Sequence, residues 1–416
     1  MRIGKANLKQ ANLFVLLSFV LVFSFAMLLD KGTGDVPLFI EKMNNVAANG
    51  ILSGFASEPA REYPPLTAAM LLIPKFLATH FSLSDLAALK LSIFLIYLLS
   101  TAILLTLSKD VLVCLVFAAA FAVSTMRLGY LDVWCAPFLF IALYLLDQDR
   151  PALGLTTYAL ACLVKWQPIV LGPFVLLYAF RAQGLLQILA LPLRKDVWRC
   201  LAAFAILLAV LLSFFGSTLL KSLEFALANS RIFLAPNGLN VPLLSGIVYR
   251  LFADPIGLPP SIRNGIDLRD HYWVYLTFRA LFAFMYLVML VGAIRAGNDR
   301  SKILLLAVGA FWSYAMLSTG VHENHLAVAV MAAIYLAMCD RKLWPIAAMT
   351  AAMFNFNLLL FYVPTTFIDI TDVPYAIGAI VSILGYLWVV AYCWYEFGEK
   401  TVSVGTSCWG SERQHG

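Results

Sequence analysis

The chain has 416 residues, of which 62% are hydrophobic and only 12% are charged, with a formal net charge of +6. A soluble globular domain carries about 25% charged residues, so this composition excludes a protein whose surface faces water on all sides. The apolar segments are long and continuous, without apolar–polar alternation, which excludes a transmembrane β-barrel and predicts an all-α polytopic transmembrane helical bundle.

The first half of the chain begins with a basic segment and then alternates apolar runs with polar breaks. The N-terminal run, about residues 12–30, is long and ends at Asp30, which favours a retained signal anchor over a cleaved signal peptide. Further spanning or half-spanning runs lie near residues 86–108, 111–126, 131–146, 152–164 and 168–180. Lys165-Trp166-Gln167-Pro168 separates the last two runs. A proline and a charge at that depth predict a broken hairpin whose tip faces a polar cavity.

The second half contains apolar runs near residues 200–220, 273–294, 302–318, 326–339, 344–363 and 374–396. A shorter run, 66–81, contains Pro74 and Lys75 and is expected to form a juxtamembrane or re-entrant helix on the outer side. Together these runs predict about 11–13 helices in one membrane domain, because about 20 apolar residues are needed to cross the bilayer. This domain would cover residues 1–396, followed by a disordered cytoplasmic tail at 397–416.

The distribution of charge predicts which side each loop faces. Lysine and arginine are denser in the segments that this arrangement places inside, as the positive-inside rule requires, and both termini are then cytoplasmic. Two long loops, about residues 30–85 and 221–272, lie outside. Loops of this length in a compact protein are usually functional, so we expect any chemistry to face outward.

The first outer loop supplies a candidate catalytic carboxylate. Asp35 follows Gly32-Thr33-Gly34, just beyond the predicted end of the first helix. A carboxylate at this boundary can act as a general base toward a hydroxyl group or can ligate a divalent metal; the structural alternative is a solvated aspartate in a turn. The same loop ends with Glu62-Tyr63-Pro64-Pro65, which predicts an extended lead into the next helix.

The densest polar cluster is Gly320 to His325, directly between two apolar runs. His322 and His325 share a face if this segment is helical, and polar groups at membrane depth are costly unless they are paired or functional. The spacing differs from the two-histidine zinc helix pattern, so phosphate recognition or acceptor positioning is favoured over a metal, with Glu323 as a neighbour. The alternative is a short solvated loop.

Several isolated polar residues are further candidates. Lys165 and Arg279 lie within apolar segments, where cations recognise lipid phosphates or extend to the interface. Asp132 precedes a predicted helix and is expected at least to cap it. Asn237 and Asn240 lie in a turn-rich segment and could bind a sugar through hydrogen bonds or simply form turns. The seven cysteines are scattered and show no metal-ligand spacing.

The order of these pieces resembles the GT-C superfamily of polyprenyl-phosphate-sugar-dependent glycosyltransferases, and within it the bacterial relatives of the GPI mannosyltransferases. The resemblance covers roughly residues 10–395 and lies in Asp35-Val36, Glu62 to Leu66, Asp132, Lys165 to Pro168, Asn237 to Asn240, and His322-Glu323. At Asn324-His325 the chain departs from the commoner arginine and aromatic residue, so the sugar stays open.

The resemblance implies an inverting transfer of one sugar, mannose or another hexose or pentose, from a polyprenyl-phosphate donor to a lipid-linked or glycan acceptor. The reaction would take place at the outer face of a bacterial inner membrane, with Asp35 as the catalytic carboxylate and with a divalent metal as an open question. No nucleic acid is involved. Contacts with the substrates would come from Glu62, Tyr63, Asp132, Lys165, Gln167, Asn237, Asn240, Arg279, His322, Glu323 and His325.

Three other functions stay open at this point. A transporter or flippase of lipid-linked sugars would need charged or interrupted helices near the midplane, arranged in repeats, and no repeat is evident. A non-catalytic scaffold would not depend on Asp35 or His322. A polymerase or ligase of lipid-linked glycans would use arginines of the second outer loop, namely Arg231, Arg250, Arg263 and Arg269.

Overall fold

The computed structural model describes residues 3–57, 63–181, 187, 189–229, 234–235, 238–253, 268, 272–362 and 372–398. The structure is 87% helical and has no strands among these residues. Within the same residues six helices are long and apolar enough to cross a membrane: Gln10–Leu29, Asp85–Ser108, Lys195–Phe215, Tyr272–Ala296, Arg341–Tyr362 and Val373–Gly398. The protein is therefore an all-α polytopic membrane bundle, as the composition predicts.

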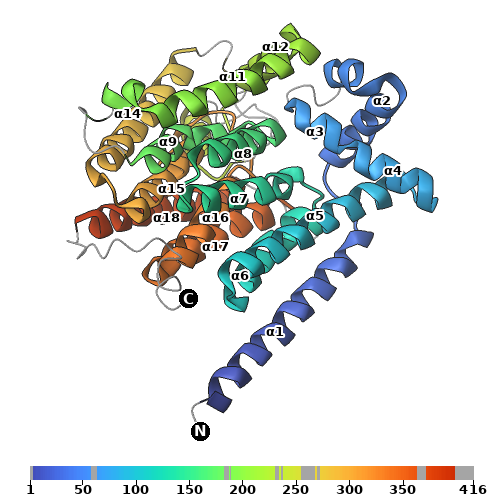
Figure 1. Ribbon diagram of the computed structural model, residues 1–416, viewed down its shortest axis with the longest axis horizontal. Coiled ribbons are helices and arrows are strands. Elements are labelled where there is room, and N and C mark those ends of the chain that lie inside the picture. Colours follow the sequence, from blue (N-terminus) through green and yellow to red (C-terminus); the bar gives the residue numbers. More distant parts are fainter. Residues whose placement is uncertain are drawn as a thin grey trace. The chain divides into compact units, whose positions relative to one another are not determined.

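The chain divides into two compact units within the predicted membrane domain. Unit 1 comprises Met1–Pro168 and Trp198–Phe225, and unit 2 comprises Ile169–Val197 and Ala226–Gly416. The helices of both units are coloured along the chain in Figure 1. Each unit is described by itself below.

Unit 1 opens with α1 (Ile3–Ala26) and the short 3-10 helix η1 (Met27–Leu29), and then forms α2 (Asp35–Ala56), α3 (Pro65–Met70) and α4 (Leu72–Phe81). It continues with α5 (Asp85–Ser108), α6 (Val111–Phe121), the π-helical turn η2 (Ala122–Arg127), the 3-10 helix η3 (Leu131–Cys135), α7 (Ala136–Asp147) and α8 (Pro151–Val164). Most of α11 (Lys195–Phe215) and α12 (Ser217–Asn229) also belongs to it.

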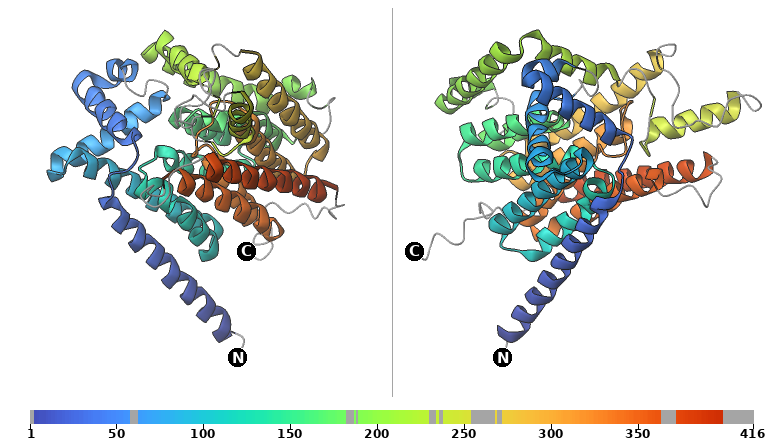
Figure 2. Two further views of the ribbon diagram at one scale, coloured as in Figure 1. Left: turned by 180° about the vertical axis from the view of Figure 1, so that it is seen from behind. Right: turned by 90° about the vertical axis from the view of Figure 1, so that its right-hand side faces the viewer.

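The first helix of unit 1 is mostly exposed. Its C-terminal part packs against α6 and η2, whereas Phe19 and Val22 expose 66% and 69% of their surface. In both views of Figure 2 the N-terminal part of α1 extends away from the rest of unit 1. Large apolar side chains in this position are expected to face lipid.

The predicted first outer loop is largely helical, which corrects the expectation of an irregular segment. Val36, Phe39, Met43 and Val46 of α2 are all buried, and their spacing of three to four residues is that of a helix face. This helix is not apolar enough to cross a membrane, and its sequence therefore resembles a loop more than a membrane span. The run at 66–81 forms two short helices, α3 and α4, divided at Leu71.

The second helical correction concerns the run predicted at 200–220. Helix α11 begins five residues earlier, at Lys195, and ends at Phe215, before Gly216 adopts φ +54 and α12 begins. A glycine with positive φ interrupts a helix at little steric cost. The second outer loop therefore begins as α12 and later contains α13 (Val241–Ala253).

Unit 2 contains the helices α9 (Gly172–Phe180), α13, α14 (Tyr272–Ala296), α15 (Arg300–Leu317), α16 (Ala327–Cys339), α17 (Trp344–Tyr362) and α18 (Asp372–Gly398), with the 3-10 turns η5 (Leu191–Leu193) and η7 (Arg341–Leu343). Helix α16 lies between α15 and α17. Each residue from Ala327 to Ala337 is at most 1% exposed. The many alanines of α16 let neighbouring helices approach closely.

Most predicted helix boundaries of both units are confirmed to within a few residues. The break after residue 164 is also confirmed: α8 ends at Val164, Lys165 is extended, and the 3-10 turn η4 (Gln167–Leu171) leads to α9. The predicted tail lies outside the described residues, apart from Phe397 and Gly398, which still belong to α18.

Candidate functional site

Asp35 is the first residue of α2 rather than part of a loop. Its side chain is half-buried, and its backbone N–H donates to the Thr33 hydroxyl at 3.4 Å. The N-terminus of a helix carries a partial positive charge that stabilises a carboxylate. The fold therefore presents this carboxylate from a fixed position at a helix start.

The loop before Asp35 is fastened to the turn that follows η2. The Thr33 N–H donates to the Leu128 carbonyl at 2.9 Å. Gly32 and Gly129 have φ of +82 and +78, and a Cβ on either glycine would lie 2.6 Å from Val36 Cγ2. Both glycines are therefore required by conformation and by space, and together they let the loop lie directly on the turn.

A buried lysine donates hydrogen bonds to the turn that follows η2. Lys90 of α5 is only 1% exposed, and its ammonium donates to the carbonyls of Met126 and Arg127 at 2.7 and 2.9 Å. These carbonyls lie where the π-helical turn η2 ends and leaves backbone acceptors without helical partners. Lys90 is not among the residues predicted from the sequence, although a lone lysine inside an apolar run is a signal of a buried, paired cation.

Asp132 and Lys165, two predicted binding residues, form a buried ion pair. The Lys165 ammonium contacts Asp132 Oδ1, and the side chains are 6% and 2% exposed. Lys165 is the residue after α8, with extended φ and ψ of −149° and 137°. Asp132 lies inside η3, whose N-cap is Tyr130, so the expectation that Asp132 caps a helix is wrong.

The helical break at Lys165 is also tied to α3. The Thr67 hydroxyl donates to the Val164 carbonyl, the last residue of α8. Gln167, another predicted binding residue, starts η4 and is half-buried. Its Oε1 is a buried acceptor without a hydrogen bond among the described residues, so this break carries polar atoms inside an apolar unit.

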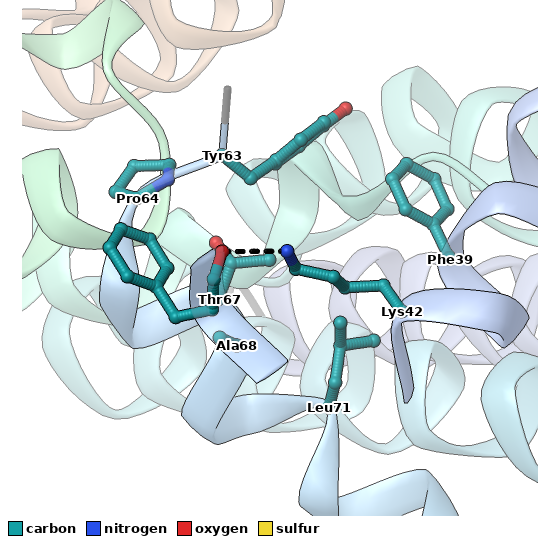
Figure 3. A pocket seen from close by; sticks show the side chains of 8 residues that line it. Phe39, Lys42, Tyr63, Pro64, Thr67, Ala68 and Leu71 are labelled. Atoms are coloured by element: carbon teal, nitrogen blue, oxygen red, sulfur yellow. Dashed lines mark hydrogen bonds between the residues drawn. The ribbon is translucent and has the colours of Figure 1, made fainter. Parts of the chain in front are cut away.

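Tyr63 lies beside a small cavity between α2 and α3 (Figure 3). Its ring meets Phe39 edge-on, with centroids 5.3 Å apart, and its carbonyl accepts from the Ser222 hydroxyl at 2.9 Å. The cavity volume is about 10 Å³, space for roughly one water molecule. Its lining consists of Phe39, Lys42, Phe55, Tyr63, Pro64, Thr67, Ala68 and Leu71.

Lys42 closes α2 on itself beside this cavity. Gly50 has φ +79 and bends the helix, so that Gly54 approaches the Val46 backbone too closely for any Cβ. The Lys42 ammonium then donates to the carbonyls of Phe55 and Ser57 at 2.7 and 2.5 Å. A cation at a helix C-terminus is stabilising, so this buried lysine has a structural role that is not evident from the sequence.

In unit 2, Glu323 is held by two side chains that follow much later in the chain. Its Oε1 accepts from the Tyr362 hydroxyl at 2.6 Å, and its carbonyl accepts from Asn357 Nδ2 at 2.9 Å. Asn357 Oδ1 in turn accepts from the Leu239 N–H at 3.1 Å. The glutamate is 2% exposed, so it is a buried and well-held carboxyl group.

Asn240 belongs to the same surroundings. Its Oδ1 accepts from the Leu243 N–H at 3.0 Å and so caps α13, while its Nδ2 donates to the Ala315 carbonyl at 3.2 Å. A Cβ on Gly238 would lie 2.7 Å from the Val321 carbonyl, so only glycine fits this approach. These contacts dock the 238–240 segment against the turn that carries Glu323.

The two histidines lie in the non-helical segment before α16, as in the loop alternative of the sequence analysis. The His325 N–H donates to the His322 carbonyl at 3.1 Å, and the two rings are 5.4 Å apart. His322 is exposed, whereas His325 is half-buried, stacks on Tyr314 and hydrogen-bonds to its hydroxyl at 3.2 Å. Arg279 lies over the Tyr275 ring at 5.2 Å.

The structure thus gathers the predicted residues into two clusters. The unit 1 cluster consists of the loop before Asp35 and the turn held by Lys90, and the Asp132–Lys165 pair is a separate contact of the same unit. The unit 2 cluster combines Asn240, Glu323 and His325 with Tyr314, Asn357 and Tyr362, while Arg279 lies over Tyr275. Glu62 and Asn237 lie outside the described residues, as do the side chains of the second-loop arginines. Among the described residues, no group of three or more histidine, cysteine or acidic side chains could hold a metal ion.

Comparison with known proteins adds no relative. The chain matches no protein-family model and no curated protein. The substrate-binding roles assigned to the individual residues stay predictions.

Proposed function

We propose that the protein is a membrane glycosyltransferase that moves one sugar from a polyprenyl-phosphate donor to a lipid-linked or glycan acceptor at the outer face of the membrane. The observation that carries this proposal is Asp35: a half-buried carboxylate at the start of α2, directly after a loop whose backbone is fastened by Thr33 to Leu128. The first motif of the resemblance to the GT-C superfamily begins at this residue.

Sugar transfer needs a base that is held still. An acceptor hydroxyl must lose its proton as it attacks the sugar, and a positioned carboxylate can accept that proton and contribute about 10²–10⁴-fold to the rate. Asp35 fits this role because its backbone is fixed on both sides, by the Thr33 contact before it and by α2 after it.

The leaving group of this reaction is a lipid phosphate, which needs cationic or N–H donors. Within unit 2, His322 is exposed and Arg279 is half-buried over the Tyr275 ring, so this unit carries donors of that kind. Glu323 and Asn357 hold the histidine-bearing turn in place. Asn240 contributes by docking its own segment, since both ends of its amide are used within unit 2.

The experiment that tests this proposal offers the purified protein a panel of radiolabelled polyprenyl-phosphate sugars together with a membrane lipid extract. Transfer of label from one donor into a new lipid or glycan product supports the proposal and names the sugar. Proteoliposomes loaded with the same donors separate the main rival: movement of intact donor across the bilayer without a new product would indicate a flippase and would contradict the transferase.

A further inference from the structure

We infer that Lys90 is a positioning residue for Asp35, acting through the turn that follows η2; this rests on the proposed function. Lys90 touches neither Asp35 nor a reacting atom in the contacts described above. Its ammonium holds two carbonyls, and the chain between those carbonyls and Asp35 is short and continuous.

The first step of this chain joins Lys90 to the turn. Among the residues of α5, an apolar side chain would be the ordinary choice at a position that is 1% exposed. The ammonium instead donates to Met126 and Arg127 at 2.7 and 2.9 Å. The turn thereby receives two charge-assisted hydrogen bonds. These bonds restrain the position of the next carbonyl, that of Leu128.

The second step joins the turn to the Asp35 loop. The Leu128 carbonyl accepts from the Thr33 N–H at 2.9 Å, two residues before Asp35. A Cβ on Gly129 would lie 3.6 Å from Lys90 Cε and 2.6 Å from Val36 Cγ2. Gly129 therefore lies between the Lys90 side chain and Val36. Val36 directly follows the proposed base, Asp35.

A second connection to the same loop is weaker. Arg127 pairs with Asp30 at 3.2 Å, but these side chains are 35% and 49% exposed. Exposed ion pairs of this kind hold their partners only slightly. The buried lysine is therefore the main anchor, and its loss should release the loop although the Arg127–Asp30 pair is intact.

A spin label can measure this release without any assay of activity. Gly34 precedes Asp35, has an ordinary φ of −60°, and offers open space within 4 Å of an added Cβ. A nitroxide attached to Gly34→Cys should report the motion of the loop by electron paramagnetic resonance, with the signal of labelled wild-type protein subtracted. The spectrum is compared for Lys90→Met, for Lys90→Gln and for a control.

The control is Lys302→Met. Lys302 in unit 2 also donates from its ammonium to a backbone carbonyl, that of Phe397 at 3.0 Å. We expect Lys90→Met to make the label at position 34 more mobile and so to narrow its electron paramagnetic resonance lines. We expect Lys302→Met to leave these lines unchanged. Glutamine is one atom shorter than lysine and cannot hold both carbonyls, so Lys90→Gln should give an intermediate spectrum and decides the matter if Lys90→Met does not fold.

Kinetics then separates positioning from general damage. Misplacement of a catalytic group by about 1 Å can cost on the order of 10²-fold in rate, so Lys90→Met should lower kcat at least about tenfold while the donor KM stays within about threefold. Unchanged label mobility in folded Lys90→Met protein, or an unchanged kcat despite a mobile label, would overturn the inference. If the wild type transfers no sugar from any donor, the proposed function fails, and the spectra alone decide whether Lys90 anchors the loop.

Discussion

The buried Asp132–Lys165 pair allows a stability prediction that is independent of function. Its side chains are only 2% and 6% exposed. Removing one member of a buried pair leaves the other charge in a medium of low polarity and costs about 3–5 kcal/mol, whereas replacing both members by apolar groups is close to neutral. We therefore expect Lys165→Met and Asp132→Leu each to destabilise the protein by about 3–5 kcal/mol, and the double variant to be more stable than either.

The measurement is a double-mutant cycle on purified protein, with reversible unfolding in mixed micelles followed by circular dichroism. The matched control is Lys75→Met, because Lys75 pairs with Asp85 at 3.5 Å with both side chains about one-third exposed. That pair should contribute about 0–1 kcal/mol. The reasoning is refuted if Lys165→Met costs no more than Lys75→Met, or if the two single effects simply add in the double variant.

Two further substitutions test the clusters one at a time. Gly32→Ala should cost about 1–2 kcal/mol, because φ of +82 disfavours any side chain and the new methyl group would lie 2.6 Å from Val36 Cγ2. Gly34→Ala, in open space with φ −60°, should melt like wild type; equal melting of the two variants would count against the described loop. Tyr362→Phe, which removes the donor to Glu323 at 2.6 Å, should destabilise by about 1.5–3 kcal/mol. Tyr392→Phe, which loses an exposed hydrogen bond, should have little effect, and an equal loss in both tyrosine variants would contradict the importance of the Glu323 contact.

The membrane architecture was predictable because it follows from local composition. Continuous apolar length predicts helices, and Pro168 beside Lys165 predicts the break between α8 and α9, which the structure confirms. Helix α2 was missed because its apolar residues occupy one face only, so its mean hydropathy stays below that of a membrane span. Its helical spacing, from Val36 to Val46, was the signal to read.

The candidate residues were predictable as individuals but not as partners. Asp132 and Lys165 are 33 residues apart in sequence, and Glu323 and Tyr362 are 39 apart, so their contacts depend on how whole helices pack. In the sequence, Lys90 is only one lysine among apolar residues. Its role depends on carbonyls of a π-helical turn, and no local sequence pattern predicts that turn. A polar residue at membrane depth is therefore expected to have a partner elsewhere in the chain, which the sequence alone does not identify.

The claim that Asp35 is the base is tested most directly by comparing Asp35→Asn with Glu41→Gln, which removes an exposed carboxylate from the same helix. With the donor that the wild type uses, single-turnover transfer and equilibrium donor binding are measured for both variants. The account predicts that Asp35→Asn binds donor with nearly unchanged affinity but transfers at least about 10²-fold more slowly, while Glu41→Gln behaves as wild type. Transfer by folded Asp35→Asn protein at a rate within threefold of wild type would contradict it.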